Sequence, residues 1–361
     1  DAMIGYTYQT SNRTFLTGSS SKYTDESLKH NNLSGGSQFA APLSGESSSN
    51  LHSLIGRVNY TLLDRYNATA TFRADRSSRF SHNHNWGVFP SLGLSWNVDQ
   101  ERFLKSQGWL SSLKLRASVG TVGNQEIGDY QYSTAYTTST TGGNVHYTKS
   151  NAANSNLKWE TTRRVNLGFE GNFIDNRLHV NFNWFSSWTS GLVALRHLAW
   201  TSGLDVNYAN GGKLKNTGYN LDMSYRMLNT KDWHWELGAS VGHYKNKVTE
   251  IGTDNKSILT DICNGTIITA VGNPVGMFYG YKTDGVLSTA AQAQAANLGY
   301  LDNAGKKIAY EAGDMKFVDR DNDGIISEAD RVIIGDPNPD IYGNIYTRLN
   351  WKHWTLDAAL T

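Results

Sequence analysis

The sequence predicts an antiparallel transmembrane β-barrel, an all-β fold whose strands are joined alternately by short turns and long loops. The first observation is alternation within strands: in residues 88–98, Leu92, Leu94 and Trp96 fall on one face and polar residues on the other. Successive side chains of a strand point to opposite faces, so a period of two indicates a strand with one apolar face. The second observation is that short and long connections alternate along the chain, as in outer-membrane barrels.

The predicted strands form five hairpins after an opening strand at residues 2–9, roughly ten or eleven strands in all. The hairpins pair residues 52–62 with 65–76, 88–98 with 112–121, 163–173 with 177–186, 219–228 with 233–245, and 341–351 with 354–361. Short turns are predicted at Leu63–Asp64, 174–176, 229–232 and Lys352–His353, with a longer one at 99–111. The long connections are 10–50, 77–87, 122–162, 187–218 and 246–340.

Composition agrees with strands in a membrane. The chain has 35 Gly but only 5 Pro, as expected where strands need their N–H donors. Its 11 Trp and 19 Tyr suit the two aromatic girdles of a membrane barrel. The tryptophans predicted near strand ends are Trp109, Trp184, Trp188, Trp233, Trp235, Trp351 and Trp354. The alternative on composition alone is a soluble β-sandwich with these residues in its core and on its surface.

Charge, hydropathy and cysteine content argue against several classes of protein. The formal net charge is +1, with 33 Lys and Arg scattered among 32 Asp and Glu, so no nucleic-acid surface is indicated. The single Cys263 excludes an internal disulfide and is interpreted as inert. Mean hydropathy is −0.49, and no apolar run approaches the about 20 residues of a transmembrane helix. No catalytic set stands at a recognised spacing, so the sequence does not indicate an enzyme.

Several segments resemble the SusC/RagA group of TonB-dependent transporters, in the order of that family from about residue 52 onward. They are RADRSSRF (73–80), WGVFPSLGLSW (86–96), VGNQEIGDYQY (122–132), NLKWETTRRVNLGFE (156–170), VGNPVGMFYGYKTDGV (271–286) and GDMKFVDRDNDGIISEADRVIIGDPNP (313–339). The resemblance implies a plugged barrel of about 22 strands. Residues 1–361 would then be the C-terminal part of the barrel, with the plug domain, TonB box and final strands outside this chain. An open sheet in lipid would leave backbone groups unpaired, so other residues are expected to complete it.

The same resemblance implies a nutrient importer of the Gram-negative outer membrane. Its substrates would be oligosaccharides or peptides, and its energy would come from the inner-membrane TonB complex through N-terminal segments outside this chain. The implied partners are a SusD-like surface lipoprotein, the glycan or peptide substrate and membrane lipid, and no nucleic acid. The competing interpretations are a calcium-dependent surface adhesin or glycan-binding β-protein and, third, a barrel esterase or protease.

The most specific local motif is the acidic loop DRDNDGIISEAD at residues 319–330. It matches the 12-residue calcium loop, with Gly324 at the sharp turn and Ser327 at the ninth position. The predicted ligands of a structural Ca²⁺ are Asp319, Asp321, Asp323, the carbonyl of Ile325 and Asp330. Asp330 replaces the usual Glu, which predicts weak binding, about 10⁻⁴–10⁻³ M. The alternative is a solvated turn held by side-chain hydrogen bonds to the backbone.

Three weaker features carry expectations of their own. His82 and His84 could share a metal, although a solvated loop pair is the better interpretation. Four strand residues could line a permeation path or could simply form the wet face of the sheet: Arg73, Asp75, Arg116 and Glu170. Residues 288–298 predict a short capped helix with Gly299 after it.

The alternation also predicts an orientation in the membrane. The short turns should face the periplasm and the long loops the outside. The residues predicted to face lipid include Leu94, Trp96, Leu167, Phe169, Val180 and Phe182.

Overall fold

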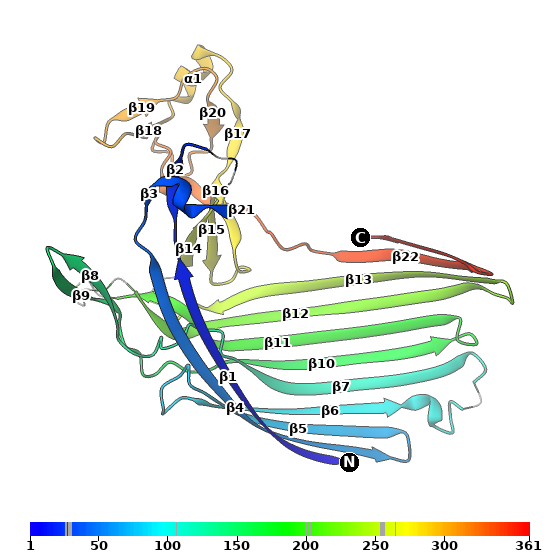
Figure 1. Ribbon diagram of the computed structural model, residues 1–361. Helices are drawn as coiled ribbons and strands as arrows, with labels where there is room; N and C mark the ends of the chain where they lie inside the picture. The colour runs from blue at the N-terminus through cyan, green and yellow to red at the C-terminus, as the bar shows by residue number, and fades with distance from the viewer. Residues whose placement is uncertain are drawn as a thin grey trace. The chain divides into compact units, whose positions relative to one another are not determined.

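A computed structural model describes residues 1–361 except 26, 28–30, 106, 199–200, 202–203, 205, 253–256 and 264. Its main feature is one antiparallel sheet of eleven strands in the order β1-β4-β5-β6-β7-β10-β11-β12-β13-β22-β23 (Figure 1). The strand order follows the chain, so each strand pairs with the next strand of the sheet. This confirms the predicted antiparallel all-β fold and its hairpins.

The eleven strands include every strand that the alternation predicts. They are β1 (Ala2–Thr17), β4 (Leu43–Leu62), β5 (Tyr66–Ser77), β6 (Trp86–Asn97), β7 (Leu110–Asn124), β10 (Glu160–Phe173), β11 (Leu178–His197), β12 (Val206–Asn229), β13 (Trp233–Glu250), β22 (Tyr342–Trp351) and β23 (Trp354–Leu360). Several extend well beyond the predicted bounds on the side of the long loops. After Leu43, the first residues of β4, SGESSSN, contain no large apolar side chain on either face, so no alternation indicates a strand there.

The long connections contain small sheets of their own, where the sequence predicts only loops. They hold β2 (Ser20–Tyr23), η2 (Leu33–Gly35) and β3 (Gly36–Phe39), then β8 (Ala135–Thr141) with β9 (Asn144–Asn151), whereas η3 (Val98–Gln100) lies in the turn between β6 and β7. The longest holds β14 (Ser257–Ile262), β15 (Gly265–Ala270), β16 (Met277–Tyr281), β17 (Thr283–Val286), α1 (Ala290–Ala296), β18 (Gly299–Leu301), β19 (Lys307–Ala309), β20 (Met315–Phe317), η5 (Glu328–Asp330) and β21 (Arg331–Gly335). None of the described helices is long and apolar enough to cross a membrane.

The predicted helix is present as α1, with caps at both ends. The Thr289 hydroxyl accepts a hydrogen bond from the Gln292 amide at 3.2 Å, which satisfies one free N–H of the first turn. At the other end, Asn297 adopts a left-handed conformation with φ 50° and closes the helix. The terminating residue is therefore Asn297, two positions before the predicted Gly299.

The short turns are tight because their residues accept positive φ. Leu63 and Asp64, between β4 and β5, have φ values of 54° and 55°. Residues 174–176, between β10 and β11, are all left-handed as well. Such turns match the twist of paired strands, and these two lie where the sequence places them.

The strands have one apolar and one polar face. In the first compact unit (residues 1–94, 118–163 and 191–210), Leu54, Val58 and Phe72 are exposed on one face. In the second unit (residues 95–117, 164–190 and 211–361), Leu167 and Ile345 are exposed in the same manner. So much exposed apolar surface on a regular sheet is typical of contact with lipid.

Aromatic rings gather at the short-turn ends of the strands, as the girdle prediction requires. In the second unit, Trp109 stacks on Phe173 with centroids 5.9 Å apart, and Trp233 stacks on Trp351 at 5.4 Å. The tryptophans of β11 differ from the prediction, because β11 continues to His197 and leaves Trp184 and Trp188 well inside the strand.

Candidate functional site

Two loop segments and a strand of the first unit meet on a small buried core. It consists of Phe80, Phe89, Leu157 and Trp159, each at most 8% exposed. The Trp159 ring lies 5.3 Å from the Phe80 centroid and 5.4 Å from that of Phe89. These residues come from the β5–β6 loop, from β6 and from the segment before β10, so the core joins separate parts of the chain.

Asn85 connects the same segments through its backbone. Its carbonyl accepts hydrogen bonds from the Trp159 indole at 3.1 Å and from the Ser77 amide at 2.9 Å. Both bonds lie in a region with little water, where a hydrogen bond is electrostatically stronger than in water. The β5–β6 loop is therefore held at a fixed position over the end of β5.

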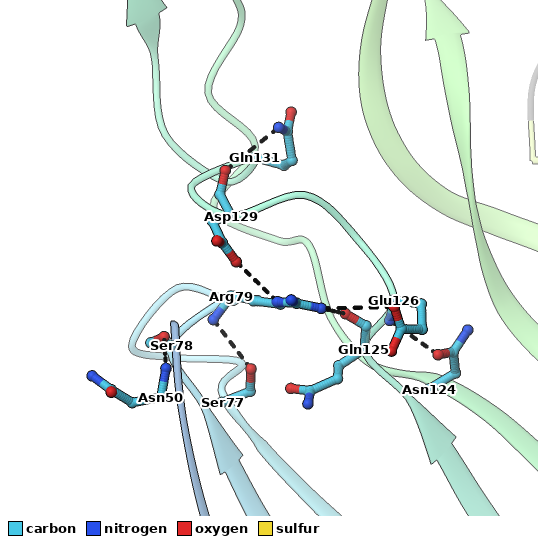
Figure 2. A network of polar contacts seen from close by, with 9 residues as sticks. All are labelled: Asn50, Ser77, Ser78, Arg79, Asn124, Gln125, Glu126, Asp129 and Gln131. Atoms are coloured by element: carbon cyan, nitrogen blue, oxygen red, sulfur yellow. Dashed lines mark hydrogen bonds and ion pairs between the residues drawn. The ribbon is translucent and has the colours of Figure 1, made fainter. Parts of the chain in front are cut away.

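Arg79 ties the β5–β6 loop to the segment after β7 (Figure 2). Its Nε donates to Asp129 Oδ1 at 2.9 Å, and its Nη1 donates to the Gln125 carbonyl at 3.2 Å. Glu126 lies 3.9 Å from the same guanidinium. The Arg79 and Asp129 side chains are only 24% and 14% exposed, so this pair is better shielded from water than a surface ion pair.

Asn210 of β12 joins the loop-side parts of β11 and β12 to the segment before β10. Its Nδ2 donates to the carbonyls of Lys158 and Gly191 at 2.8 and 2.7 Å, and its Oδ1 accepts from the Lys158 amide at 2.9 Å. Glu160 adds a second bond to β11 by accepting from the Val193 amide at 2.7 Å.

We refer to residues 77–89, 124–132, 154–160, 191–194 and 207–210 as the loop junction. It holds the bases of the loops through a buried aromatic core, hydrogen bonds to the backbone and a shielded ion pair, an arrangement suited to positioning and recognition. Apart from the His82–His84 pair, the sequence predicts no site among these residues. The signal was present in RADRSSRF and VGNQEIGDYQY, where charged, amide and aromatic residues are dense at the ends of strands.

The acidic loop 319–330 is the second candidate site, and the structure brings three of its predicted ligands together. Carboxylate oxygens of Asp319, Asp321 and Asp323 lie within 4.8 Å of one another. Gly324, at the predicted sharp turn, has φ 79°. The loop is fixed to β18 by a hydrogen bond from the Ile326 amide to the Gly299 carbonyl at 2.7 Å.

Asp330 is placed differently from the other three acids. It is fully buried, and its two carboxylate oxygens accept hydrogen bonds from the Arg320 amide at 2.7 Å and the Ser327 amide at 2.8 Å. Asp330 thereby forms a capping box with Ser327 at the start of η5. Its predicted role as a metal ligand, like that of the Ile325 carbonyl, stays a prediction.

Two carboxyl groups of the acidic loop have pKa values shifted in opposite directions. Burial acts to raise the pKa of Asp319, but hydrogen bonds from the Gly324 and Asn322 amides outweigh it and lower the pKa. Burial, together with the nearby charge of Asp323, raises the pKa of Asp321. A cation beside Asp321 would relieve the repulsion between Asp321 and Asp323.

The polar strand residues form pairs on the face opposite the apolar one. Arg73 binds Asp75 at 2.7 Å and the Ser53 hydroxyl at 3.0 Å. In the second unit, Arg116 lies 3.8 Å from Glu170 and binds Asn181 at 2.6 Å. These residues are thus arranged as paired charges along the polar face.

The weaker candidates remain isolated. His82 and His84 lie in the β5–β6 loop, and among the described residues the only carboxylate, imidazole or thiol cluster with metal-binding spacing is the acidic one. Cys263 is exposed in the turn between β14 and β15.

Comparison with known proteins shows which family has this architecture. Residues 2–360 match the family described as TonB dependent receptor-like, beta-barrel. The chain is 33% identical to TonB-dependent receptor P3 of Formosa agariphila, over 98% of this chain and 36% of that protein. It is 30% identical to TonB-dependent receptor SusC of Bacteroides thetaiotaomicron, over 86% of this chain and 31% of that protein.

Solved structures agree on the fold. The structure of the RagAB peptide transporter superposes with a TM-score of 0.78 at 24% identity, covering 99% of this chain and 38% of that chain. The chain thus spans about a third of the length of the relatives that it matches. The antiparallel sheet and its exposed apolar face agree with the family match, which covers nearly every residue. The chain therefore belongs to the TonB-dependent receptor β-barrel family of the outer membrane.

Proposed function

We propose that this chain forms part of an outer-membrane importer that takes up oligosaccharides or peptides with energy from the TonB complex. The observation that carries the proposal is the family match over residues 2–360. SusC and the RagAB peptide transporter are among the relatives. The same match favours a receptor over the adhesin and enzyme interpretations.

The two faces of the sheet support passage of a polar substrate. Paired charges such as Arg73–Asp75 and Arg116–Glu170 lie on the polar face, which in a barrel lines the lumen. The loop junction fixes the bases of several long loops. A rigid base allows loops to present recognition groups with little loss of conformational entropy.

We further propose a SusD-like surface lipoprotein as partner at the long loops. The β8–β9 hairpin offers contact surface for a substrate or a partner, since Tyr136 and Tyr147 are 62% and 72% exposed. Tyrosines combine apolar area with a hydroxyl at low entropic cost, and they are enriched at interfaces.

The test is uptake by a strain that lacks the receptor gene and carries the full-length receptor on a plasmid. Cells would be given labelled oligosaccharides or peptides, with and without a functional TonB complex. Uptake that needs both the receptor and TonB is expected for one of the two classes. Surface binding that persists without any TonB-dependent uptake would contradict the proposal and favour the glycan-binding alternative.

A hairpin variant sharpens this test. Replacement of residues 136–149 by a short Gly-Ser linker is expected to lower uptake, because it removes exposed tyrosines without touching the eleven-stranded sheet. The linker variant must show the same heat-modifiable migration as the wild type. Unchanged uptake by a correctly folded variant would exclude this hairpin from recognition.

A further inference from the structure

The apolar face of β1, β4 and β5 ends in a set of amphipathic residues. On β4, the apolar face runs from Tyr60 through Val58 and Leu54 to His52. Tyr60 and His52 are eight positions apart in the sequence, about 26 Å along a strand. At the tilt of a barrel strand this spans about 20 Å of an apolar band that is about 25 Å tall. His52 therefore lies near the boundary between lipid tails and headgroups, on the side of the long loops.

Two tyrosines of β1 hold His52 in place. The Tyr6 hydroxyl lies 2.7 Å from His52 Nδ1, and the Tyr8 ring lies 4.7 Å from the His52 ring. Both tyrosines are more than half exposed on the apolar face. This arrangement is typical of the aromatic girdle at a membrane interface. Because the two tyrosines hold the His52 ring, the direction in which its Nε2 points is also held.

A cavity of about 320 Å³ opens at this boundary. Its lining includes His52 from β4, Arg76 from β5 and His82 from the β5–β6 loop, and none of its lining residues is acidic. Arg76 pairs across the strands with His52. Within the described parts of the chain, no carboxylate lies within 4.0 Å of the Arg76 guanidinium. An exposed guanidinium without a counter-ion is suited to a phosphate, which its planar fork binds through two hydrogen bonds.

The same cavity offers groups for neutral hydroxyls. Asn85 lines it at 7% exposure, and its Oδ1 accepts no hydrogen bond from the described residues. A buried amide oxygen without a donor is costly, and rotation of the Asn85 side chain toward the cavity would let a ligand hydroxyl donate to this oxygen. The Ser78 hydroxyl, which accepts from the Asn50 amide at 2.8 Å, still has its own proton to donate.

A separate apolar notch lies on the same face of β4, further toward the lipid tails. Gly56 stands between Ile4 of β1 and Phe72 of β5 in the register of the sheet. A Cβ at Gly56 would meet nothing within 4 Å. These residues line a mostly apolar pocket of about 550 Å³. It starts four residues from His52, about 13 Å along the strand, on the side of the lipid tails.

We propose that the cavity and the notch together bind one glycolipid of the outer leaflet. A phosphate on the sugar headgroup lies against Arg76 and the two histidines, sugar hydroxyls meet Asn85 and Ser78, and an acyl chain lies over Gly56. A free phosphate would use only the first of these features, and the notch therefore favours a lipid. The proposal requires the long loops to face outward, and it does not depend on which substrate is imported.

The experiment measures glycolipid bound to the full-length receptor, purified from outer membranes in mild detergent and examined by native mass spectrometry. The variant is Arg76→Gln, and the control is Arg102→Gln, an exposed arginine that lines neither pocket. Arg76→Gln is expected to retain about tenfold less glycolipid, because it loses a charge-assisted bidentate contact. The Arg102→Gln protein should match the wild type, and all forms must keep heat-modifiable migration.

Further measurements identify the ligand and keep the test informative if one variant does not fold. Enzymatically dephosphorylated glycolipid should bind the wild type about as weakly as intact glycolipid binds Arg76→Gln. Gly56→Leu fills the notch and is expected to lower retention about threefold even if Arg76→Gln does not fold. Equal retention by Arg76→Gln and Arg102→Gln would overturn the proposal. Displacement of the lipid by millimolar inorganic phosphate would also overturn it, because it would show a site for anions from solution. Uptake assays are separate, so failure here leaves the proposed function untouched.

Discussion

At the scale of single residues, some glycines lie directly under an aromatic ring of the neighbouring strand. A Cβ added at Gly123 would overlap the Phe89 ring, and one at Gly238 would overlap Tyr346. The ring thus covers backbone that a glycine would otherwise leave bare, a pairing that stabilises glycines in sheets. In the loop junction this allows Phe89 to reach Trp159.

The first prediction concerns this packing. Gly123→Ala should destabilise the loop junction by about 1–3 kcal/mol, because the Phe89 ring is confined by Trp159 and cannot move without strain. Gly93→Ala is the matched control, since a Cβ there meets nothing within 4 Å. Hydrogen exchange of residues 124–132 in the full-length receptor would measure the difference. Equal exchange in the two variants would contradict the packing argument.

The second prediction concerns the acidic loop, whose calcium ligands remain predicted. Terbium should bind the intact receptor, and Asp321→Ala should weaken its affinity by about tenfold or more, since one of a few hard oxygen ligands is lost. Glu328→Gln is the control, because it removes a charge from the same loop at a side chain that is 85% exposed. Terbium luminescence gives the affinity. Absence of any saturable signal would leave the solvated turn, held by its own amide hydrogen bonds, as the correct interpretation.

At the scale of the element, the strands are longer than their apolar stretches. The alternation in β4 spans the part that meets lipid, yet hydrogen bonds to β1 continue to Leu43. Outside the membrane neither face needs to be apolar, and the backbone hydrogen bonds between the two strands are enough to continue them. Binary pattern therefore locates the membrane-spanning part of a strand and not its end.

The third prediction tests which face of β10 meets lipid. Leu167 is 48% exposed among apolar neighbours, whereas Asn166 accepts a hydrogen bond from Arg164 on the polar face. Leu167→Arg should cost about 2–4 kcal/mol near the middle of the membrane, and Asn166→Arg should cost far less. Chemical unfolding of the receptor in lipid vesicles measures both. Similar losses of stability would mean that neither face contacts lipid.

At the scale of the whole molecule, short turns and long loops predict an orientation in the membrane. A tag in the turn at Gly142–Gly143 or at Gly305 should be reached by antibody on intact cells, because both positions lie in long connections. A tag at Leu63–Asp64 should be reached only after the outer membrane is opened. Labelling at Leu63–Asp64 on intact cells would reverse the assignment, and with it the outer-leaflet position of the glycolipid proposal.

The sequence indicated the sheet more fully than the sites. Each of the five hairpins was recognisable because every strand carries an apolar stripe of period two and each tight turn has residues that accept positive φ or stand in a polar break. The acidic loop was recognisable because its ligands follow one another within a short segment. The loop junction was not, because Arg79, Asp129, Trp159 and Asn210 are far apart in the chain and no local pattern connects them.

The sequence by itself determined the antiparallel sheet, the division into apolar and polar faces and the family resemblance, because these depend on neighbours within a strand or on ordered motifs. Only the tertiary structure decided that Asp330 caps a helix, that Arg79 joins two loops and that Arg76 faces a cavity beside His52. The Asp330 cap is a local alternative to metal binding, and the other two are arrangements of residues distant in sequence. Their energies depend on burial and on the position of a partner, and a linear pattern contains neither.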